Sequence, residues 1–327
     1  MKLKGVLLYS GGLDSTLAGL ICEKLDIEIY PYHLKTPFCK CPKTCDNKIS
    51  FLKNIKLSFA GIDYIKEVIF QPKYGYGRGM NPCIDCRIYL FKKAKKYLEE
   101  IKGDLLITGE VLSQRPKSQY LHQLIIIEKE ADVKGIVLRP LSAKLLPPTI
   151  FEEKGLIDRE KLYGIKGRQR KEQIRLLQEF GILEVPPTSC GCLLVDENFS
   201  KRLKDFKENL KKDFDLLDIE ILKIGRHFRI LGKKYVIGRN KEENERLIKI
   251  GEVKNYFLVI PKDFNAPVLL SSENEIQDKA FWLITAYSKD KRKEFTCLIK
   301  KGKEIIKEEK ITIASTPKRE DFQVYKI

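Results

Sequence analysis

Long apolar runs are absent from this 327-residue sequence, and so is a cleavable signal at its start. A helix needs about 20 mostly apolar residues to cross a bilayer, and a secretory signal needs an apolar core of about 7–15 residues. Residues 1–9 lead instead directly into a glycine-rich turn. We therefore expect a cytoplasmic protein that has no membrane partner.

Histidine, which is the usual general base of enzymes with a nucleophilic residue, is scarce in this sequence. The three histidines, His33, His122 and His227, are scattered, and none stands in a pattern that indicates a catalytic triad. Cysteine is plentiful, with nine residues, which is an odd number. In a cytoplasmic protein this count favours metal or redox chemistry over a disulfide framework.

Acidic residues are outnumbered, because 62 Lys and Arg stand against 45 Asp and Glu and give a net charge of +17. Residues 219–327 hold 24 of the basic and 16 of the acidic residues, hence +8, so both parts of the chain are basic. This excess predicts a polyanionic partner, with nucleic acid as the first candidate. The alternative is a solvated, lysine-rich surface of the kind common in thermophile proteins.

The sequence is organised around residues 7–16, Leu-Leu-Tyr-Ser-Gly-Gly-Leu-Asp-Ser-Thr. Residues 5–9 predict a buried strand and residues 16–25 a helix. Two adjacent glycines let the backbone approach a ligand, and a helix N-terminus favours an anion. No Lys-Ser or Lys-Thr pair follows the glycines, so this is not a Walker loop. The residues predicted to hold phosphate are Ser10, Gly11, Gly12, Asp14 and Ser15.

Short apolar strands alternate with helical patterns through the first 200 residues. The strands are expected at residues 27–33, 63–70, 105–108 and 135–138, and the helices at 48–60, 87–102 and 168–180. This alternation predicts an α/β fold with a doubly wound parallel sheet. Ligands of such sheets bind at the carboxyl ends of the strands, which is where the phosphate loop falls.

The pattern changes after a strongly charged helix expected over residues 198–217. The remainder reads as mostly β, including residues 254–260 and 280–287, with a short helix at 241–250. The chain is therefore expected to contain three parts, which are a phosphate-loop domain over residues 1–195, a charged linker helix over 196–218 and a smaller α+β domain over 219–327.

Cys83-x-x-Cys86 stands at the start of a predicted helix, where the pKa of a thiol is lowered, so we expect accessible thiolates. Cys190 and Cys192 are a second source of thiols. Two plus one thiolates suit either an iron–sulfur cluster with one open iron or a persulfide relay.

The remaining cysteines carry weaker signals. Three thiols, Cys39, Cys41 and Cys45, either bind an accessory zinc or form no site, since no fourth ligand is evident nearby. Cys22 and Cys297 are expected to be packing residues.

The strand at 105–108 ends in polar residues that suit a nucleotide. Gly109 permits a close approach, and Glu110 and Gln114 would make polar contacts. Arg115 or Lys144 could neutralise charge that develops on phosphate.

Several of these motifs resemble those of one group of enzymes. The Ser-Gly-Gly-x-Asp-Ser order resembles the PP-loop of the ATP pyrophosphatases, which cleave ATP between its α and β phosphates. Residues 108–114, T-G-E-V-L-S-Q, are similar to the T-G-E-S-L-G-Q motif of tRNA 4-thiouridine synthase, and residues 139–141 resemble its R-P-L. Residues 81–86, N-P-C-I-D-C, are similar to the N-P-x-x-x-C segment of the tRNA 2-thiouridylases.

These resemblances imply roles for individual cysteines. The first active cysteine of the 2-thiouridylases falls on Cys86, and Cys192 fits the second. Cys83 completes the C-x-x-C plus C set of the cluster-dependent thiolation enzymes, which implies a 4Fe-4S cluster on Cys83, Cys86 and Cys192. Cys190 is the other candidate for the third thiol.

Residues 238–244, G-R-N-K-E-E-N, resemble the G-R-N-x-x-E-N signature of the RNA-binding domain of the NFACT proteins. The resemblance implies that residues 219–327 are such a domain, with RNA contacts from Lys233, Lys234, Arg239 and Asn240. Without the family, the segment reads as a basic strand pair and a turn that can contact phosphate.

Together these features imply an ATP-dependent tRNA uridine sulfurtransferase that uses Mg²⁺ and takes sulfur from a cysteine desulfurase or from sulfide. Asp14 would position the metal or the phosphates, and the cysteines would deliver sulfur by a persulfide or a cluster. The alternatives are another PP-loop enzyme that acts on a small molecule, or a catalytically silent RNA-binding factor.

Overall fold

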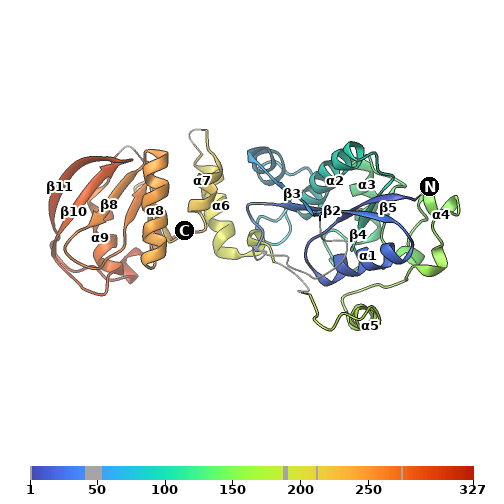
Figure 1. Cartoon of the computed structure of the whole chain (residues 1–327). Coiled ribbons are helices and arrows are strands. Elements are labelled where there is room, and N and C mark those ends of the chain that lie inside the picture. The colour runs from blue at the N-terminus through green and yellow to red at the C-terminus, as the bar shows by residue number, and fades with distance from the viewer. Residues whose placement is uncertain (1, 41–53, 187–190, 211–212, 274) are drawn as a thin grey trace. The chain divides into compact units, whose positions relative to one another are not determined.

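The computed structural model describes residues 2–40, 54–186, 191–210, 213–273 and 275–327. Contacts divide the chain into two compact units, Met1–Val195 and Asp196–Ile327. Figure 1 colours the first unit from blue to green and the second from yellow to red. Within the described ranges, no helix combines the length and the apolar character that crossing a membrane requires.

The first unit is built on a five-stranded sheet in which neighbouring strands pair in parallel. Its elements are, in chain order, β1 (Lys4–Leu8), α1 (Leu13–Lys24), β2 (Glu28–Lys35), β3 (Lys56–Phe59), the π-helical turn η2 (Tyr64–Ile69), α2 (Cys83–Glu100), β4 (Leu105–Thr108), α3 (Leu121–Glu130), β5 (Val137–Leu138), α4 (Ile150–Glu153) and α5 (Lys171–Glu179). The strand order is β3-β2-β1-β4-β5, which confirms the predicted doubly wound sheet.

This strand order places the ligand-binding edge between β1 and β4. The chain moves outward from β1 through β2 to β3, and then returns to the other side of β1 with β4. The connections that leave the carboxyl ends of two such neighbouring strands run to opposite faces of the sheet, and a crevice forms between them. The phosphate loop follows β1 and Gly109 follows β4, so both segments border this crevice.

Alternate residues of β1 supply the two cores of the unit. Leu7 packs in the cluster that contains Leu17 of α1 and Leu176 of α5, whereas Val6 packs in the cluster with Phe91 of α2. Because successive side chains of a strand point to opposite faces, helices must cover both sides of the sheet. Figure 1 shows α1 and α2 on these two faces.

Two predicted elements of this unit are wrong. Residues 63–70, expected as a strand, form η2, in which Tyr64, Ile65, Val68 and Ile69 are buried at helical spacing. The helix expected over residues 48–60 is replaced over 56–59 by β3, which pairs with β2. The earlier part of that expected helix, residues 48–53, lies outside the described residues.

The second unit contains a six-stranded sheet in the order β11-β10-β8-β9-β7-β6, with antiparallel pairs throughout. Its elements are α6 (Glu197–Glu208), α7 (Leu216–Ile221), β6 (Arg226–Ile230), β7 (Lys233–Ile237), α8 (Lys241–Lys254), β8 (Phe257–Pro261), β9 (Leu269–Ser271), α9 (Asp278–Tyr287), β10 (Glu294–Lys301), β11 (Glu304–Thr312) and the turn η6 (Glu320–Tyr325). This is the expected smaller α+β part of the fold.

The structure of the second unit differs from the sequence-based prediction in two places. Residues 280–287, expected as β, lie in α9, whose buried Ala280, Leu283 and Ile284 recur at helical spacing. The charged helix expected over 198–217 is interrupted, because α6 ends at Glu208 and α7 starts anew at Leu216 under the Asp215 cap.

The α6 helix is fixed to the sheet of the second unit by charge. Asp205 of α6 receives hydrogen bonds from Arg229 of β6 at 2.7 Å and from Lys234 of β7 at 2.6 Å. The carboxylate is mostly buried, and the two cations hold its pKa below the usual range.

Candidate active site

The phosphate loop is closed upon itself by hydrogen bonds. Ser10 donates its backbone N–H to Ser15 Oγ at 3.3 Å, and Ser15 donates its hydroxyl to the Gly12 carbonyl at 2.9 Å. Gly11 has a φ of +74°, the left-handed conformation for which the sequence supplies glycine. No side chain caps α1 at Gly12, so the first N–H groups of the helix are available to an anion.

Gly109 is required by the helix that carries this loop. A β-carbon at Gly109 would lie 2.5 Å from the backbone nitrogen of Ser15 and would also strike the carbonyl group of Asp14. The end of β4 therefore packs directly against the first turn of α1. Sequence reasoning expected the small residue to admit a nucleotide, and the contact shown here is with the protein backbone.

Asp14 is the charged residue of the loop, and its two carboxylate oxygens have different surroundings. Oδ2 accepts a hydrogen bond from Gln114 Nε2 at 2.7 Å, and Arg170 Nη2 lies 3.9 Å from the same oxygen. Oδ1 is buried and has no hydrogen-bond partner among the described residues. Burial raises the pKa of the Asp14 carboxyl, and the Gln114 bond and the Arg170 charge counteract that rise.

Gln114 is itself held by a residue that sequence reasoning missed. Gln173 of α5 is fully buried and donates from Nε2 to Gln114 Oε1 at 3.2 Å. The chain Gln173–Gln114–Asp14 thus connects α5 to the phosphate loop. The available sequence signal was a polar residue on the apolar face of the predicted 168–180 helix, and no motif contains it.

Glu110 joins two of the motifs noted in the sequence. Its carboxylate lies between Arg139 Nε at 3.0 Å and Arg87 Nε at 3.3 Å. The T-G-E and R-P-L segments are therefore connected by a buried ion pair, since Glu110 is 1% and Arg139 4% exposed. Removing one partner of such a pair typically costs about 3–5 kcal/mol.

A cavity of about 410 Å³ opens over the phosphate loop. Seven of the predicted site residues line it, namely Ser10, Gly12, Asp14, Ser15, Gly109, Glu110 and Cys192. Sequence reasoning did not assign His33, Cys39, Arg87 or Gln119 to this cavity, and the structure places them in its wall. Arg115 also lines it, whereas Lys144 is absent from the lining and pairs with Glu160 at 2.8 Å.

The predicted thiols differ in whether they line this cavity. Cys192 lines the cavity, whereas Cys83 and Cys86, in the first turn of α2, are absent from its lining. Cys86 Sγ accepts a hydrogen bond from the Tyr64 hydroxyl at 3.2 Å. Cys190 lies outside the described residues, as do Cys41 and Cys45. Cys22 and Cys297 are completely buried in the cores, as expected of packing residues.

Cys39 stands directly opposite Cys192. The two residues form an isolated antiparallel bridge, flanked by Leu193 N–H bonded to the Phe38 carbonyl at 2.9 Å and Lys40 N–H bonded to the Gly191 carbonyl at 3.5 Å. This is the pair type in which the central residues do not bond each other and their side chains come closest. A fourth thiol thus joins the site, beside the three expected.

The expectation of thiolates with lowered pKa is wrong. Burial raises the pKa of Cys83 and Cys86, and it raises the pKa of Cys192 to about 11. The Arg87 and Arg115 charges oppose the rise at Cys83 without reversing it. Loss of water therefore outweighs the favourable position at the start of α2. In the described part of the chain, no three Cys, His, Asp or Glu side chains meet in the arrangement of a metal centre.

In the second unit, the four predicted RNA contacts are engaged within the fold. Lys233 pairs with Glu275, Lys234 with Asp205, and Arg239 with Glu243. Asn240 accepts the Glu243 backbone N–H at 2.9 Å and so caps α8. Lys234 is the most enclosed, with 12% of its side chain exposed, whereas 46% of the Arg239 side chain is exposed.

The G-R-N-x-x-E-N segment fixes the turn from β7 to α8. A β-carbon at Gly238 would strike the Asn244 side chain, whose Oδ1 accepts the Val268 N–H at 3.1 Å. Glu243 accepts hydrogen bonds from the backbone of Arg239 and of Gly225. The residue types in the signature are thus explained by packing and capping of this turn.

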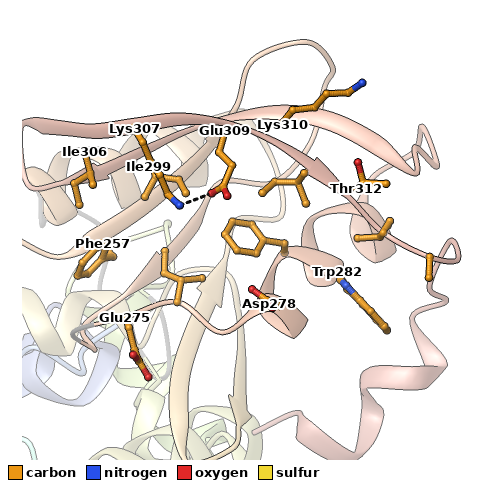
Figure 2. Close-up of a pocket in the computed structure, with 15 residues that line it drawn as sticks. Phe257, Glu275, Asp278, Trp282, Ile299, Ile306, Lys307, Glu309, Lys310 and Thr312 are labelled. Carbon is orange, nitrogen blue, oxygen red and sulfur yellow. Dashed lines mark ion pairs between the residues drawn. The ribbon is translucent and has the colours of Figure 1, made fainter.

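Another cavity, of about 640 Å³, lies in the second unit beneath the β10–β11 hairpin. Figure 2 shows Phe257 and Trp282 among its lining residues, and the ion pair of Lys307 with Glu309 at 2.8 Å. Trp282 is the only tryptophan of the chain. None of the four residues predicted to contact RNA lines this cavity.

Comparisons with known families agree with the two units. Residues 1–144 match the family model described as thiamine biosynthesis protein (ThiI), and residues 225–325 match the model of the NFACT protein RNA binding domain. The first unit therefore carries a ThiI-family domain and the second an NFACT-type RNA-binding domain, which confirms both resemblances seen in the sequence.

Curated relatives of the chain are named as tRNA-modifying enzymes. The tRNA-specific 2-thiouridylase MnmA of Petrotoga mobilis is 23% identical over 293 residues, which are 80% of this chain and 76% of that protein. The MnmA of Methylobacillus flagellatus is 25% identical over 49% of this chain and 48% of its own length. The probable tRNA sulfurtransferase of Ureaplasma parvum is 31% identical over 43% of this chain and 37% of its own length.

A solved structure, a 4-thiouridine synthetase–RNA complex with bound ATP, aligns over 67% of this chain and 52% of that one, at 21% identity and a TM-score of 0.37.

Proposed function

We propose that this chain, which joins a ThiI-family domain to an NFACT-type RNA-binding domain, is an ATP-dependent tRNA uridine sulfurtransferase. The observation that carries the proposal is that one cavity is lined both by the phosphate loop and by Cys192. Activation by ATP and delivery of sulfur must occur at the same carbon atom, so both groups are needed in one site. The names of the relatives support tRNA as the substrate.

ATP is assigned to the phosphate loop. The N–H groups at the start of α1 and the hydroxyls of Ser10 and Ser15 suit phosphate oxygens. The unpartnered Oδ1 of Asp14 fits a Mg²⁺ ligand, because Mg²⁺ prefers oxygen donors and is commonly held by one or two carboxylates together with phosphates. Bound there, the metal would neutralise phosphate charge.

The chemistry proceeds in two steps. The carbonyl oxygen of the uracil attacks the α-phosphorus of ATP, the bond from the α- to the β-phosphate breaks, and pyrophosphate leaves. Adenylation is needed because a uracil carbonyl oxygen is otherwise a very poor leaving group. The outer sulfur of a cysteine persulfide then attacks the activated carbon, and AMP leaves with the electrons of the carbon–oxygen bond. A second cysteine thiolate attacks the inner sulfur and breaks the S–S bond, which frees the thiocarbonyl and leaves a disulfide that an external dithiol reduces. Arg115 in the cavity wall can stabilise charge on the phosphates.

Sulfur is assigned to the cysteines that face or adjoin the cavity, carried as a persulfide. The proposal assigns delivery to Cys192, which lines the cavity, and assigns Cys86 and Cys83, in the first turn of α2, to the relay behind it. Among the described residues, no three Cys, His, Asp or Glu side chains meet in the arrangement that a 4Fe-4S cluster would need, and Cys190 lies outside these residues. We therefore route no step through a cluster. A cysteine desulfurase, which carries sulfane sulfur as a persulfide, would supply the sulfur by transfer to a thiolate of this chain. Free sulfide would instead attack the adenylated carbon directly, without a persulfide.

The test is ATP–pyrophosphate exchange measured with and without tRNA. The proposal expects exchange that depends on RNA and formation of thiouridine, detected by mass spectrometry of digested tRNA. Exchange without RNA would indicate an enzyme that acts on a small molecule. Absence of exchange under both conditions would indicate an RNA-binding factor that has lost catalysis.

A further inference from the structure

Three arginines from two distant segments gather beside the phosphate loop. Arg115 belongs to the turn after β4, and Arg168 and Arg170 precede α5. Together with Gln114 they line a small, open cavity of about 290 Å³. Arg115 also lines the larger cavity over the loop, so one side chain is shared by the two spaces.

The backbone holds the two arginine segments together. Leu112 and Lys166 form a parallel bridge, and the Gly167 N–H donates to the Leu112 carbonyl at 2.8 Å. Gly167 has a φ of +86°, which turns the chain directly before Arg168. The arginines are therefore placed by fixed backbone, although Arg115 and Arg168 are themselves exposed at the surface.

Positive charge is in excess at this place. The Asp14 carboxylate lies 3.9 Å from Arg170 Nη2. Within the part of the chain that the structure describes, Arg115 and Arg168 form no ion pair. Partial enclosure by the protein and the like charges of Arg87 and Arg170 lower the pKa of Arg115, against the opposite charge of Asp14, so like charge crowds this guanidinium group. A multivalent anion would relieve this crowding.

We propose that Arg115, Arg168 and Arg170 form a binding site for the pyrophosphate group of the nucleotide. Guanidinium groups bind phosphate oxygens in a bidentate manner, so three of them suit two linked phosphates. The site adjoins Asp14 and the loop, where the β- and γ-phosphates would lie, and it is open to solvent. The inference rests on the proposed cleavage of ATP between its α and β phosphates, after which pyrophosphate must leave the loop.

The experiment uses the full chain and three variants. Arg168→Gln and the double variant Arg168→Gln/Arg170→Gln remove cations of the site. Arg175→Gln is the matched control, because Arg175 lies on α5 with 61% of its side chain exposed and pairs only with Glu172 and Glu179 among the described residues. Calorimetric titrations measure the dissociation constant of inorganic pyrophosphate and, separately, that of AMP, which lacks the β- and γ-phosphates.

The double variant should bind pyrophosphate at least about tenfold more weakly, whereas AMP binding should stay within about twofold in every variant. Arg168→Gln should lie between the wild type and the double variant, and Arg175→Gln should match the wild type. Because Arg168 is exposed, its single variant tests the site without disturbing the core.

Four results would overturn the proposal. The first is wild-type pyrophosphate affinity in the double variant, and the second is no pyrophosphate affinity in the wild type. The third is an equal loss for AMP and pyrophosphate, which would indicate damage to the loop. The fourth is a loss of tRNA affinity with pyrophosphate binding unchanged, which would assign the arginines to RNA. These titrations require no sulfur transfer, so a chain that binds pyrophosphate through the arginines but makes no thiouridine would contradict only the proposed function.

Discussion

Gln114 donates a hydrogen bond of 2.7 Å from Nε2 to Oδ2 of Asp14, although the two residues are 100 positions apart. One oxygen of the carboxylate is thereby fixed by the protein. The other, Oδ1, is buried without a partner among the described residues, and Asp14 lines the cavity over the phosphate loop. An amide that orients a carboxylate in this way prepares it to bind a ligand without reorganisation.

Asp14→Ala should reduce pyrophosphate release by at least about 100-fold, the loss typical of removing one group that stabilises transition-state charge. Binding of tRNA should remain nearly intact, since the NFACT-type domain lies in the other unit. Pyrophosphate release and filter binding measure the two effects. Glu23→Ala, on the exposed side of α1, is the control. Normal pyrophosphate release by Asp14→Ala would refute the assignment of this loop to the phosphates of ATP.

Asp14→Asn should raise the melting temperature at pH 7 even though it abolishes activity. Burial raises the pKa of Asp14 above its ordinary value of 3.8, so the folded state favours the protonated form and loses stability as pH rises through the folded pKa. The asparagine keeps the Gln114 bond and carries no charge. The stability gap between variant and wild type should therefore narrow as the pH falls toward 4. A gap that does not change with pH would contradict the burial argument.

Cys39 and Cys192 should form a disulfide under mild oxidation. Opposite residues of this pair type have Cα atoms about 4.5 Å apart, within the range of about 4.4–6.8 Å that a disulfide spans. Because the pKa of Cys192 is raised to about 11, the reaction with diamide should accelerate as the pH increases from 7 to 9. Peptide mapping detects the link. Cys22→Ala should leave its yield unchanged, and a link that forms in Cys39→Ser would refute the pairing.

Cys86→Ala and Cys192→Ala should each lose sulfur transfer while adenylation stays measurable, since neither residue belongs to the phosphate loop. Cys22→Ala is the control, because its side chain is completely buried in the core. Thiouridine in tRNA digests and ATP–pyrophosphate exchange separate the two steps. An active Cys86→Ala enzyme would refute the proposed sulfur relay. An active Cys192→Ala enzyme would assign the role of the third thiol to Cys190.

Measurements of iron and acid-labile sulfide in anaerobically purified protein test for the 4Fe-4S cluster that the sequence implies. Within the described residues, no three Cys, His, Asp or Glu side chains meet in the arrangement of a metal centre. We expect a persulfide, detectable by mass spectrometry of Cys192 after reaction with a sulfur donor. Stoichiometric iron that disappears in Cys83→Ala would instead establish the cluster.

Removal of the second unit should weaken tRNA binding and flatten its salt dependence. Each phosphate that the protein no longer neutralises should lower the slope by about 0.7–0.9 log units of affinity per log unit of salt. The chain should be truncated after Val195, because α6 is part of the second unit. Asp205 of α6 pairs with Arg229 and Lys234 of its sheet.

A double variant, Lys233→Ala/Arg239→Ala, tests the predicted basic turn without breaking the enclosed Lys234–Asp205 pair. Exposed Lys289 and Lys303, changed together to alanine, provide a control of equal charge. Unchanged affinity and salt slope in the truncation and in the double variant would leave the second unit without a role in RNA binding. Fluorescence of Trp282 reports separately whether RNA occupies the cavity of Figure 2.

Features that depend on neighbouring residues could be predicted from the amino-acid order. The apolar strand, the two glycines and the helix of the phosphate loop are a local pattern, and the structure has β1 ending at Leu8 and α1 beginning at Leu13. The alternation of strands and helices predicted the parallel sheet, because covered strands and amphipathic helices leave a periodic signal. Where that signal is short, as at Tyr64–Ile69 or Asp278–Tyr287, apolar residues fit strand and helix equally, and packing selected the helix.

The surroundings of the reacting groups depend on how distant segments pack in three dimensions. The opposition of Cys39 and Cys192, and the chain of Gln173, Gln114 and Asp14, bring together residues that no local motif connects. The raised thiol pKa values have the same origin, because loss of water depends on the packing of distant segments, whereas position at a helix start is visible in the sequence.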